Sequence, residues 1–211
     1  MFSIAPIQDT PRTWKVIADG IEIKPQLLTI SSDPYGTLTL GLRPEGFHGW
    51  AFKPKNGGVM TIPWSKTPTG EILIGLIHEH RPNMGNIKTW SPPGGFIDGG
   101  ESPTEAAQRE SLEEGGLDTK AAEKLPGLPV NSDRLYFTQD PHLGEGMQFF
   151  AMNIPFNSLE LVGEKEWKPK KGVINHKKES DLYFLPWRNA VLLSADSLAL
   201  SGITRLLSVL L

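Results

Sequence analysis

Acidic side chains crowd one short stretch of the chain between residues 105 and 114. Glu110 and Glu114 are four residues apart, so in a helix they lie one above the other, with Arg109 and Glu113 beside them. Carboxylates at this spacing repel one another, by about 0.2–0.5 kcal/mol per pair. Oxygen ligands gathered on one helical turn are what a hard divalent cation binds. The stretch is therefore a candidate metal site, and the alternative is an acidic helix face exposed to solvent, which the acidic residues alone favour.

The flanking residues define the helix that must hold these carboxylates. Ser102 is a good N-cap, Pro103 suits the first helical position, and Glu105 completes a capping box with Ser102. The pair Gly115–Gly116 ends the helix. A glycine-rich loop, residues 94–100, precedes it, and glycine lets the backbone approach an ion or a phosphate closely.

Taken as a whole, the stretch resembles the signature of the Nudix hydrolases, G-x5-E-x7-R-E-U-x-E-E-x-G-U, where U is apolar. Gly95, Glu101 and residues 109–117 match it at every charged and glycine position, and the one departure is Ser111 at the first U. The resemblance implies an internal ion pair between Glu101 and Arg109 that fixes the loop against the helix.

The resemblance also implies a set of metal ligands and a cofactor. Glu110 and Glu114 would be the principal ligands, Glu113 a further ligand directly or through water, and the backbone carbonyl of Gly94 would complete the set. The expected ion is Mg²⁺, with Mn²⁺ as the alternative. The implied reaction is hydrolysis of the diphosphate bond of a nucleoside diphosphate linked to another group.

A base is needed to activate the attacking water. Glu145 is the candidate, because it lies between Gly144 and Gly146 on a loop that could close over a bound diphosphate. The alternative is an ordinary exposed loop glutamate.

A narrower resemblance concerns the substrate. Residues 77–81 and 90–95, together with an N-terminal β-segment, resemble the ADP-ribose and nucleotide-sugar pyrophosphatase branch of the family. This resemblance implies that Arg81 binds the phosphates of the substrate and that the N-terminal strands exchange across a homodimer. The alternatives are a Nudix hydrolase of dinucleotides or nucleoside triphosphates, and a ligand-binding module without activity.

Composition limits the remaining classes. The 211 residues have a formal net charge of −3, which gives no general attraction to nucleic acid or to an anionic membrane. The chain has no cysteine, which excludes disulfides, zinc–cysteine sites and thiol catalysis. The first residues do not resemble a signal peptide, so we expect a cytoplasmic protein without a membrane partner.

The expected fold class is α/β (α+β), a Nudix-type α/β/α sandwich with a mixed sheet, preceded by a small antiparallel β-segment. We predict a boundary that separates residues 1–57, the β-segment and its connector, from residues 58–211. The first part is expected to contain a loose tail, a hairpin, two strands and an irregular connector, at residues 1–12, 14–24, 26–42 and 43–56 respectively. The second part is expected to contain five strands, a lysine-rich loop and an amphipathic closing helix, at residues 59–63, 71–78, 134–139, 147–154, 182–186, 164–180 and 195–211 respectively.

Overall fold

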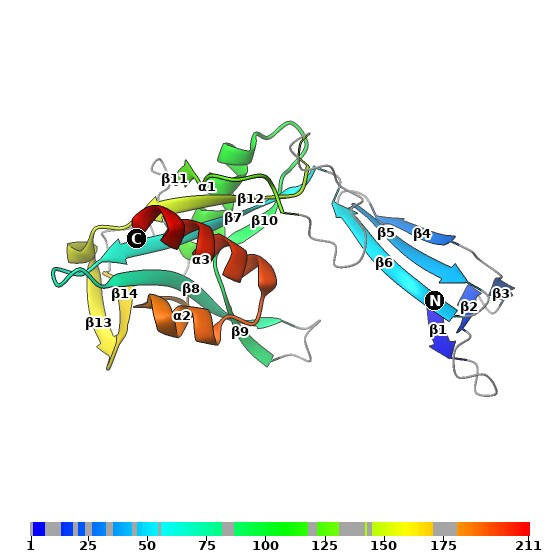
Figure 1. Ribbon diagram of the computed structural model, residues 1–211, viewed down its shortest axis with the longest axis horizontal. Helices are drawn as coiled ribbons and strands as arrows, with labels where there is room; N and C mark the ends of the chain where they lie inside the picture. The colour runs from blue at the N-terminus through cyan, green and yellow to red at the C-terminus, as the bar shows by residue number, and fades with distance from the viewer. Residues whose placement is uncertain are drawn as a thin grey trace.

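The computed structural model describes residues 2–6, 14–18, 21–23, 27–32, 36–43, 46–54, 56–81, 87–117, 122–130, 142, 145–170 and 181–211. A mixed sheet forms the core of the part that follows residue 57 (Figure 1). The nine described strands of this sheet are β7 (Gly58–Lys66), β8 (Ile72–Arg81), β9 (Ile87–Ser91), β10 (Gly94–Phe96), β11 (Ala122–Lys124), β12 (Met147–Asn153), β13 (Leu159–Gly163), β14 (Glu166–Pro169) and β15 (Leu182–Pro186).

Strand β7 is shared between two neighbours on one of its sides. Its first residues pair with β10, with Gly58 opposite Phe96, and its last residues pair with β8, with Trp64 opposite Ile74. On its other side β7 pairs with β12 in parallel, so that Gly58 is also opposite Met147. Because β7 and β12 run in the same direction, both strands begin at the same end of the sheet, next to Phe96 of the glycine-rich loop.

Helices cover the sheet on both faces. Helix α1 (Pro103–Gly115) packs Ala106 and Ala107 against Phe150 of β12. The preceding residue of the strand, Phe149, points to the opposite face and packs with Ile203. That opposite face carries α2 (Trp187–Leu193) and α3 (Ser197–Leu210). A short 3₁₀ turn, Phe156–Ser158, precedes β13. The predicted sandwich with a mixed sheet is therefore confirmed.

The N-terminal strands form two sheets of their own. Strands β1 (Phe2–Pro6), β2 (Trp14–Ala18) and β3 (Ile21–Ile23) make one, and β4 (Leu27–Ser32), β5 (Gly36–Arg43) and β6 (Gly46–Pro54) make the other. The hairpin and the two following strands are as predicted. The loose tail over residues 1–12 is wrong for β1, which pairs with β2. The irregular connector over residues 43–56 is wrong for β6, because its aromatic residues pair in register with β5.

In the second part the sequence identified the strands with strong apolar patterns and missed several short elements. Strand β14 lies inside the segment expected to be a lysine-rich loop, and the described strands β9, β10, β11 and β13 and helix α2 were not predicted. The closing helix is confirmed as α3. Strand β15 is confirmed with the predicted bounds, and β7, β8 and β12 are confirmed with shifted ends. The predicted strand at residues 134–139 lies outside the described residues.

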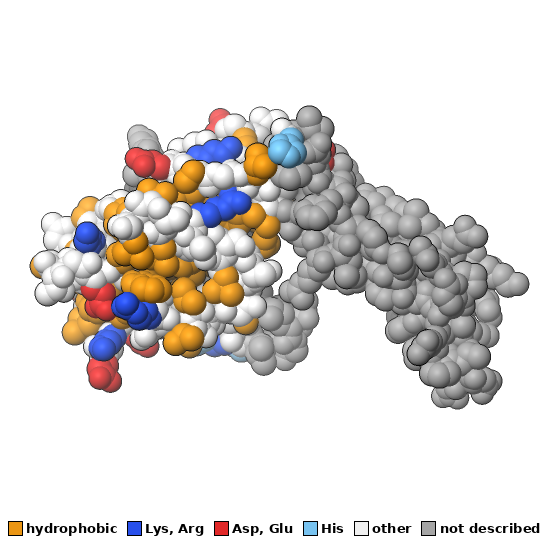
Figure 2. Space-filling view, in the orientation of Figure 1, with side chains coloured by type: hydrophobic (Ala, Val, Ile, Leu, Met, Phe, Trp, Pro, Cys, Tyr) orange, Lys and Arg blue, Asp and Glu red, His pale blue; other side chains and the backbone are white. Residues whose placement is uncertain are grey.

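Apolar side chains remain exposed on the face that carries α2 and α3 (Figure 2). Leu192 at the end of α2 and Leu211 after α3 are among the most exposed of the large hydrophobic residues described. None of the helices in the described ranges combines the length and the apolar character that crossing a bilayer requires.

Close packing of α3 on the sheet depends on Gly202. A Cβ atom at this position would lie 2.7 Å from Cδ1 of Ile62 and 2.8 Å from Cδ1 of Phe149. Replacing Gly202 by valine should therefore lower the free energy of unfolding by about 1–3 kcal/mol through overpacking. The exposed neighbour Thr204, changed to valine, should shift it by less than about 0.5 kcal/mol. Urea unfolding of both variants tests this, and equal stabilities would contradict the packing argument.

Candidate functional site

Helix α1 is fixed at both ends by its own sequence. The Ser102 hydroxyl accepts a hydrogen bond from the amide of Glu105 at 3.3 Å, and the Glu105 carboxylate accepts one from the amide of Ser102 at 2.8 Å. At the other end Gly116 adopts a φ of 65°, which favours glycine, and its amide bonds back to the Leu112 carbonyl. The predicted capping box and glycine stop are therefore confirmed, and they set where the acidic turn begins and ends.

Arg109 joins the helix to the glycine-rich loop. Its guanidinium donates hydrogen bonds to both oxygens of Glu101, each at 3.0 Å, and to the carbonyl of Phe96 at 2.9 Å. The same group donates to Glu110 at 2.7 Å and to Glu113 at 3.4 Å. The hydrogen bond with Arg109 lowers the pKa of Glu101, and Glu101 raises the pKa of Arg109 above its ordinary value. Glu101 and Arg109 thus form the ion pair that the resemblance implies.

Glu110 lies against the backbone of the loop. A Cβ atom at Gly95 would overlap Oε1 of its carboxylate, so the carboxylate occupies the space that a side chain at Gly95 would need. Only 12% of the Glu110 side chain is exposed. This burial raises the pKa of Glu110, although the contact with Arg109 acts in the opposite direction.

Glu114 approaches the adjacent residue of the same loop. One of its oxygens accepts a hydrogen bond from the Gly94 amide at 2.9 Å. Gly94 itself is pressed against β7, because a Cβ atom there would lie 2.5 Å from the Val59 carbonyl oxygen. Glu110 and Glu114 thus meet the two successive glycines Gly94 and Gly95. The role of the Gly94 carbonyl as a ligand stays a prediction.

Glu113 differs from the other two carboxylates, since 60% of its side chain is exposed. Within the described ranges, the structure contains no group of three or more His, Asp or Glu side chains placed to hold a metal ion. The geometry explains this finding, because Arg109 draws Glu110 and Glu113 toward itself while Glu114 bonds to Gly94. The carboxylates near the loop backbone are therefore Glu110 and Glu114, with Glu113 on the outside of the turn.

Ser111 occupies the motif position where an apolar residue is usual. It is buried, and its hydroxyl donates a hydrogen bond to the Ala107 carbonyl at 2.6 Å. The helix therefore packs on the sheet at this position with its polar atom satisfied internally.

Glu145 enters the same region through backbone contacts that the sequence did not suggest. It directly precedes Gly146, whose carbonyl accepts a hydrogen bond from the Gly58 amide at 3.3 Å. The carbonyl of the neighbouring Gly57 accepts a hydrogen bond from the Ile97 amide at 3.4 Å, and Ile97 belongs to the glycine-rich loop of the motif (the motif loop, residues 94–100). Gly57 has a φ of 78°, and a Cβ atom there would lie 2.9 Å from the Gly146 carbonyl oxygen. Residues 57 and 58 therefore connect residues 145–147 (the Glu145 segment) to the motif loop. The feature of the sequence that could have indicated this connection is the pair of glycines at the start of β7.

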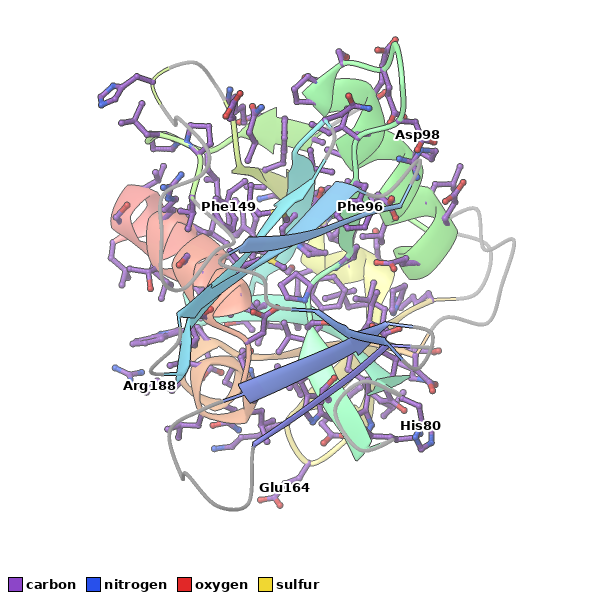
Figure 3. The ribbon with its side chains drawn as sticks, turned by 90° about the vertical axis from the view of Figure 1, so that its right-hand side faces the viewer. His80, Phe96, Asp98, Phe149, Glu164 and Arg188 are labelled. Atoms are coloured by element: carbon purple, nitrogen blue, oxygen red, sulfur yellow. The ribbon has the colours of Figure 1, made fainter. Side chains whose placement is uncertain are left out.

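Residues 77–81, which carry the narrower resemblance, form the end of β8. Figure 3 shows Phe96 and Asp98 beside α1, and His80 in a different part of the view. Arg81 ends β8, and its side chain is outside the described part of the structure. His78 stacks on Trp90 with ring centroids 4.1 Å apart, and burial lowers its pKa.

Comparison with known proteins gives one family. The model of the NUDIX domain matches residues 63–174, which is more than half of the chain. A search of curated proteins found no match.

Solved structures with a similar chain path include the following three. An Ap4A hydrolase from Caenorhabditis elegans is 16% identical, with a TM-score of 0.48, and the match covers 74% of this chain and 98% of that one. A mutT/nudix family protein from Listeria innocua is 22% identical, with a TM-score of 0.49 and coverages of 74% and 94%. A protein described as an ADP compounds hydrolase is 14% identical, with a TM-score of 0.49 and coverages of 87% and 91%.

Burial of Glu110 has a consequence for stability. Because its pKa is raised above 4.5 in the folded protein, folding favours the protonated form. The stabilising contribution is present below the unfolded pKa and is lost as the pH rises through the folded pKa. Replacing Glu110 by glutamine should therefore make the metal-free protein more stable than the wild type at about pH 7, with a smaller difference at about pH 4.

Glu101 supplies the matched comparison, because its pKa is lowered mainly by Arg109. Its contribution is present above the unfolded pKa and is lost as the pH falls through the folded pKa, so Glu101→Gln should destabilise the protein at about pH 7. Denaturant unfolding of both variants in EDTA measures the two signs. A Glu110→Gln variant less stable than the wild type near neutrality would contradict the assignment.

Proposed function

This chain belongs to the Nudix family, and on that premise we propose that it is a metal-dependent pyrophosphohydrolase whose site is built from α1 and the Gly94–Gly95 loop. The observation that carries the proposal is the position of two carboxylates, Glu110 and Glu114, against the backbone of two successive glycines. A site made only for stability would not bury a carboxylate whose pKa is raised by that burial.

A divalent cation fits these residues. Mg²⁺ usually takes one or two protein carboxylates and keeps several waters or substrate phosphates, so Glu110 and Glu114 suffice as principal ligands. Glu113 would join them directly or through water, and the Gly94 carbonyl would complete the set. Mn²⁺ is the alternative ion for the same oxygen donors. When bound, the cation supplies neutralisation of the negative charge on a diphosphate.

Glu145 is proposed as the base. Its carboxylate would accept the proton of the water whose oxygen forms the new bond to phosphorus, while the bond from phosphorus to the bridging oxygen breaks. The backbone contacts of Gly146 with Gly58, and of Gly57 with Ile97, support this role because they place the Glu145 segment next to the motif loop.

The proposed substrate is ADP-ribose or a related nucleotide sugar, and the products would be a nucleoside monophosphate and a sugar phosphate. This narrower proposal depends on the sequence of residues 77–81 and 90–95, with Arg81 binding the phosphates. We also propose the division of the chain between residues 57 and 58, and a homodimer. The separate sheets formed by β1–β3 and β4–β6 are compatible with that division.

A substrate panel with a ligand variant tests the reaction. We expect turnover of ADP-ribose or another nucleotide sugar in Mg²⁺, none in EDTA, and less on dinucleotides and nucleoside triphosphates. Glu114→Gln should reduce kcat at least about a hundredfold while the protein stays folded, because one ligand is lost and carboxylate repulsion falls. The exposed Glu123→Gln on β11 is the control. Full activity of Glu114→Gln would remove the metal assignment, and failure on every substrate would favour a binding module.

The role of the base is tested separately. Glu145→Gln should lower kcat by roughly 10²–10⁴-fold with little change in KM, because the proton acceptor is lost while binding contacts remain. Glu164→Gln, an exposed glutamate drawn well away from α1 in Figure 3, serves as the control. An unchanged kcat for Glu145→Gln would mean that another group activates the water.

A further inference from the structure

Arg205 of α3 makes an unusual set of contacts for a surface arginine. Its guanidinium lies 4.9 Å from the centroid of the buried Phe149 ring and donates a hydrogen bond to the Leu128 carbonyl at 2.5 Å. It also lies against Gly127, because a Cβ atom there would be 3.1 Å from Cζ of Arg205. Gly127 has a φ of 105°, a conformation that favours glycine. The arginine therefore binds the backbone of the segment Gly127–Val130 on one side and the sheet on the other.

This segment is connected directly to the start of β12. Val130 and Met147 exchange two backbone hydrogen bonds, each 2.8 Å long. Gly146, with a φ of 108°, is packed so tightly against this segment that a Cβ atom would lie 2.8 Å from the Val130 carbonyl oxygen. Glu145 is the next residue toward the N-terminus, so its backbone position is determined by how Val130 is held.

The Glu145 segment also contacts the residues that lead to the motif loop. Gly146 accepts a hydrogen bond from Gly58, and Gly57 accepts one from Ile97. The Glu145 segment therefore lies between two backbone segments. Gly57–Gly58 connects it to the glycine-rich loop, and Gly127–Val130 is bound by Arg205. Gly57 and Gly146 make the closest of these contacts, backbone against backbone. A shift of one segment is therefore transmitted to the next, because there are no flexible side chains between them.

We propose that Arg205 is a positioning residue, which fixes Glu145 relative to the motif loop by holding the Leu128 carbonyl and, through Val130, the start of β12. The inference rests on the proposed function, because it gives Arg205 a purpose only if Glu145 acts on the substrate. A conventional structural role for Arg205 would be to stabilise α3, and the two roles predict different measurements.

Arg188 provides a matched control. It also stacks on an aromatic ring, with its guanidinium 4.5 Å from the centroid of Trp187, but both residues belong to α2. Figure 3 shows Arg188 well separated from Phe149, the residue beneath Arg205. Removing either guanidinium therefore removes a similar cation–π contact, and only Arg205 also holds the segment that leads to Glu145.

The first measurement is hydrogen exchange in Arg205→Gln, Arg205→Lys and Arg188→Gln. We expect faster exchange at the amides of Val130 and Met147 in Arg205→Gln, an intermediate effect in Arg205→Lys, and no change in Arg188→Gln. The α3 amides of Ile203 and Leu206 should keep their protection. Unchanged exchange at Val130 and Met147, or loss of protection along α3 to the same extent, would overturn the inference whether or not the protein is active.

The second measurement is kinetic. Arg205→Gln should lower kcat roughly tenfold or more with little change in KM, because a small displacement of a reacting group is costly. On the Glu145→Gln background the same substitution should have no further effect on kcat, since there is no base left to position. Equal effects of Arg205→Gln with and without Glu145 would overturn the inference. If no substrate is hydrolysed by the wild type, the proposed function fails, and hydrogen exchange alone decides whether Arg205 holds the segment.

Discussion

The contacts of one guanidinium hold the candidate site together. Arg109 bonds to both oxygens of Glu101, to the Phe96 carbonyl and to the first carboxylate of the acidic turn, Glu110. Arginine can do this because its planar group offers several donors in a fixed arrangement, which lysine lacks. One cation thereby offsets repulsion among carboxylates within the helix and also ties the helix to the loop in front of it. The position of Glu110 near Gly95 depends on that connection, and the proposed metal site depends on the position of Glu110.

A second constraint is the close approach of backbone segments at the start of β7, which glycine makes possible. The side chain missing at Gly95 leaves room for a carboxylate, and the side chain missing at Gly57 leaves room for the Gly146 carbonyl. The shared strand β7 explains why these approaches meet, because its start pairs with β10 on one side and with β12 on the other. The site is therefore assembled from backbone of three strands and carboxylates of one helix. Burial of Glu110 is a cost of this arrangement to the metal-free protein, consistent with a position selected for binding rather than stability.

Local patterns predicted local structure well, and pairing between distant residues was harder. The capping box at Ser102 and the stop at Gly116 depend on neighbours a few residues away, and the structure has both. By contrast, β6 was expected to be an irregular connector, since its glycines and Pro54 obscure the strand pattern and its partner lies on β5. Strand β14 was hidden in a lysine-rich segment for the same reason, because strand formation there is decided by pairing with β13 and β15. The strand expected at residues 134–139 lies outside the described residues.

The sequence by itself determined the acidic turn, the residues that cap its helix, and the family to which the spacing of Glu101, Arg109 and Glu110 belongs. These depend on separations along the chain, which a helix and a short loop convert directly into positions. Only the tertiary structure decided that Glu110 and Glu114 meet the backbone of Gly94 and Gly95 while Glu113 stays in solvent. It also decided that Gly57 and Gly58 lie between the motif loop and the Glu145 segment, and that Arg205 reaches Leu128. The physical reason is that each of these contacts involves the backbone of a residue distant in sequence, and the backbone is the same at every position, so the sequence alone does not identify the partner.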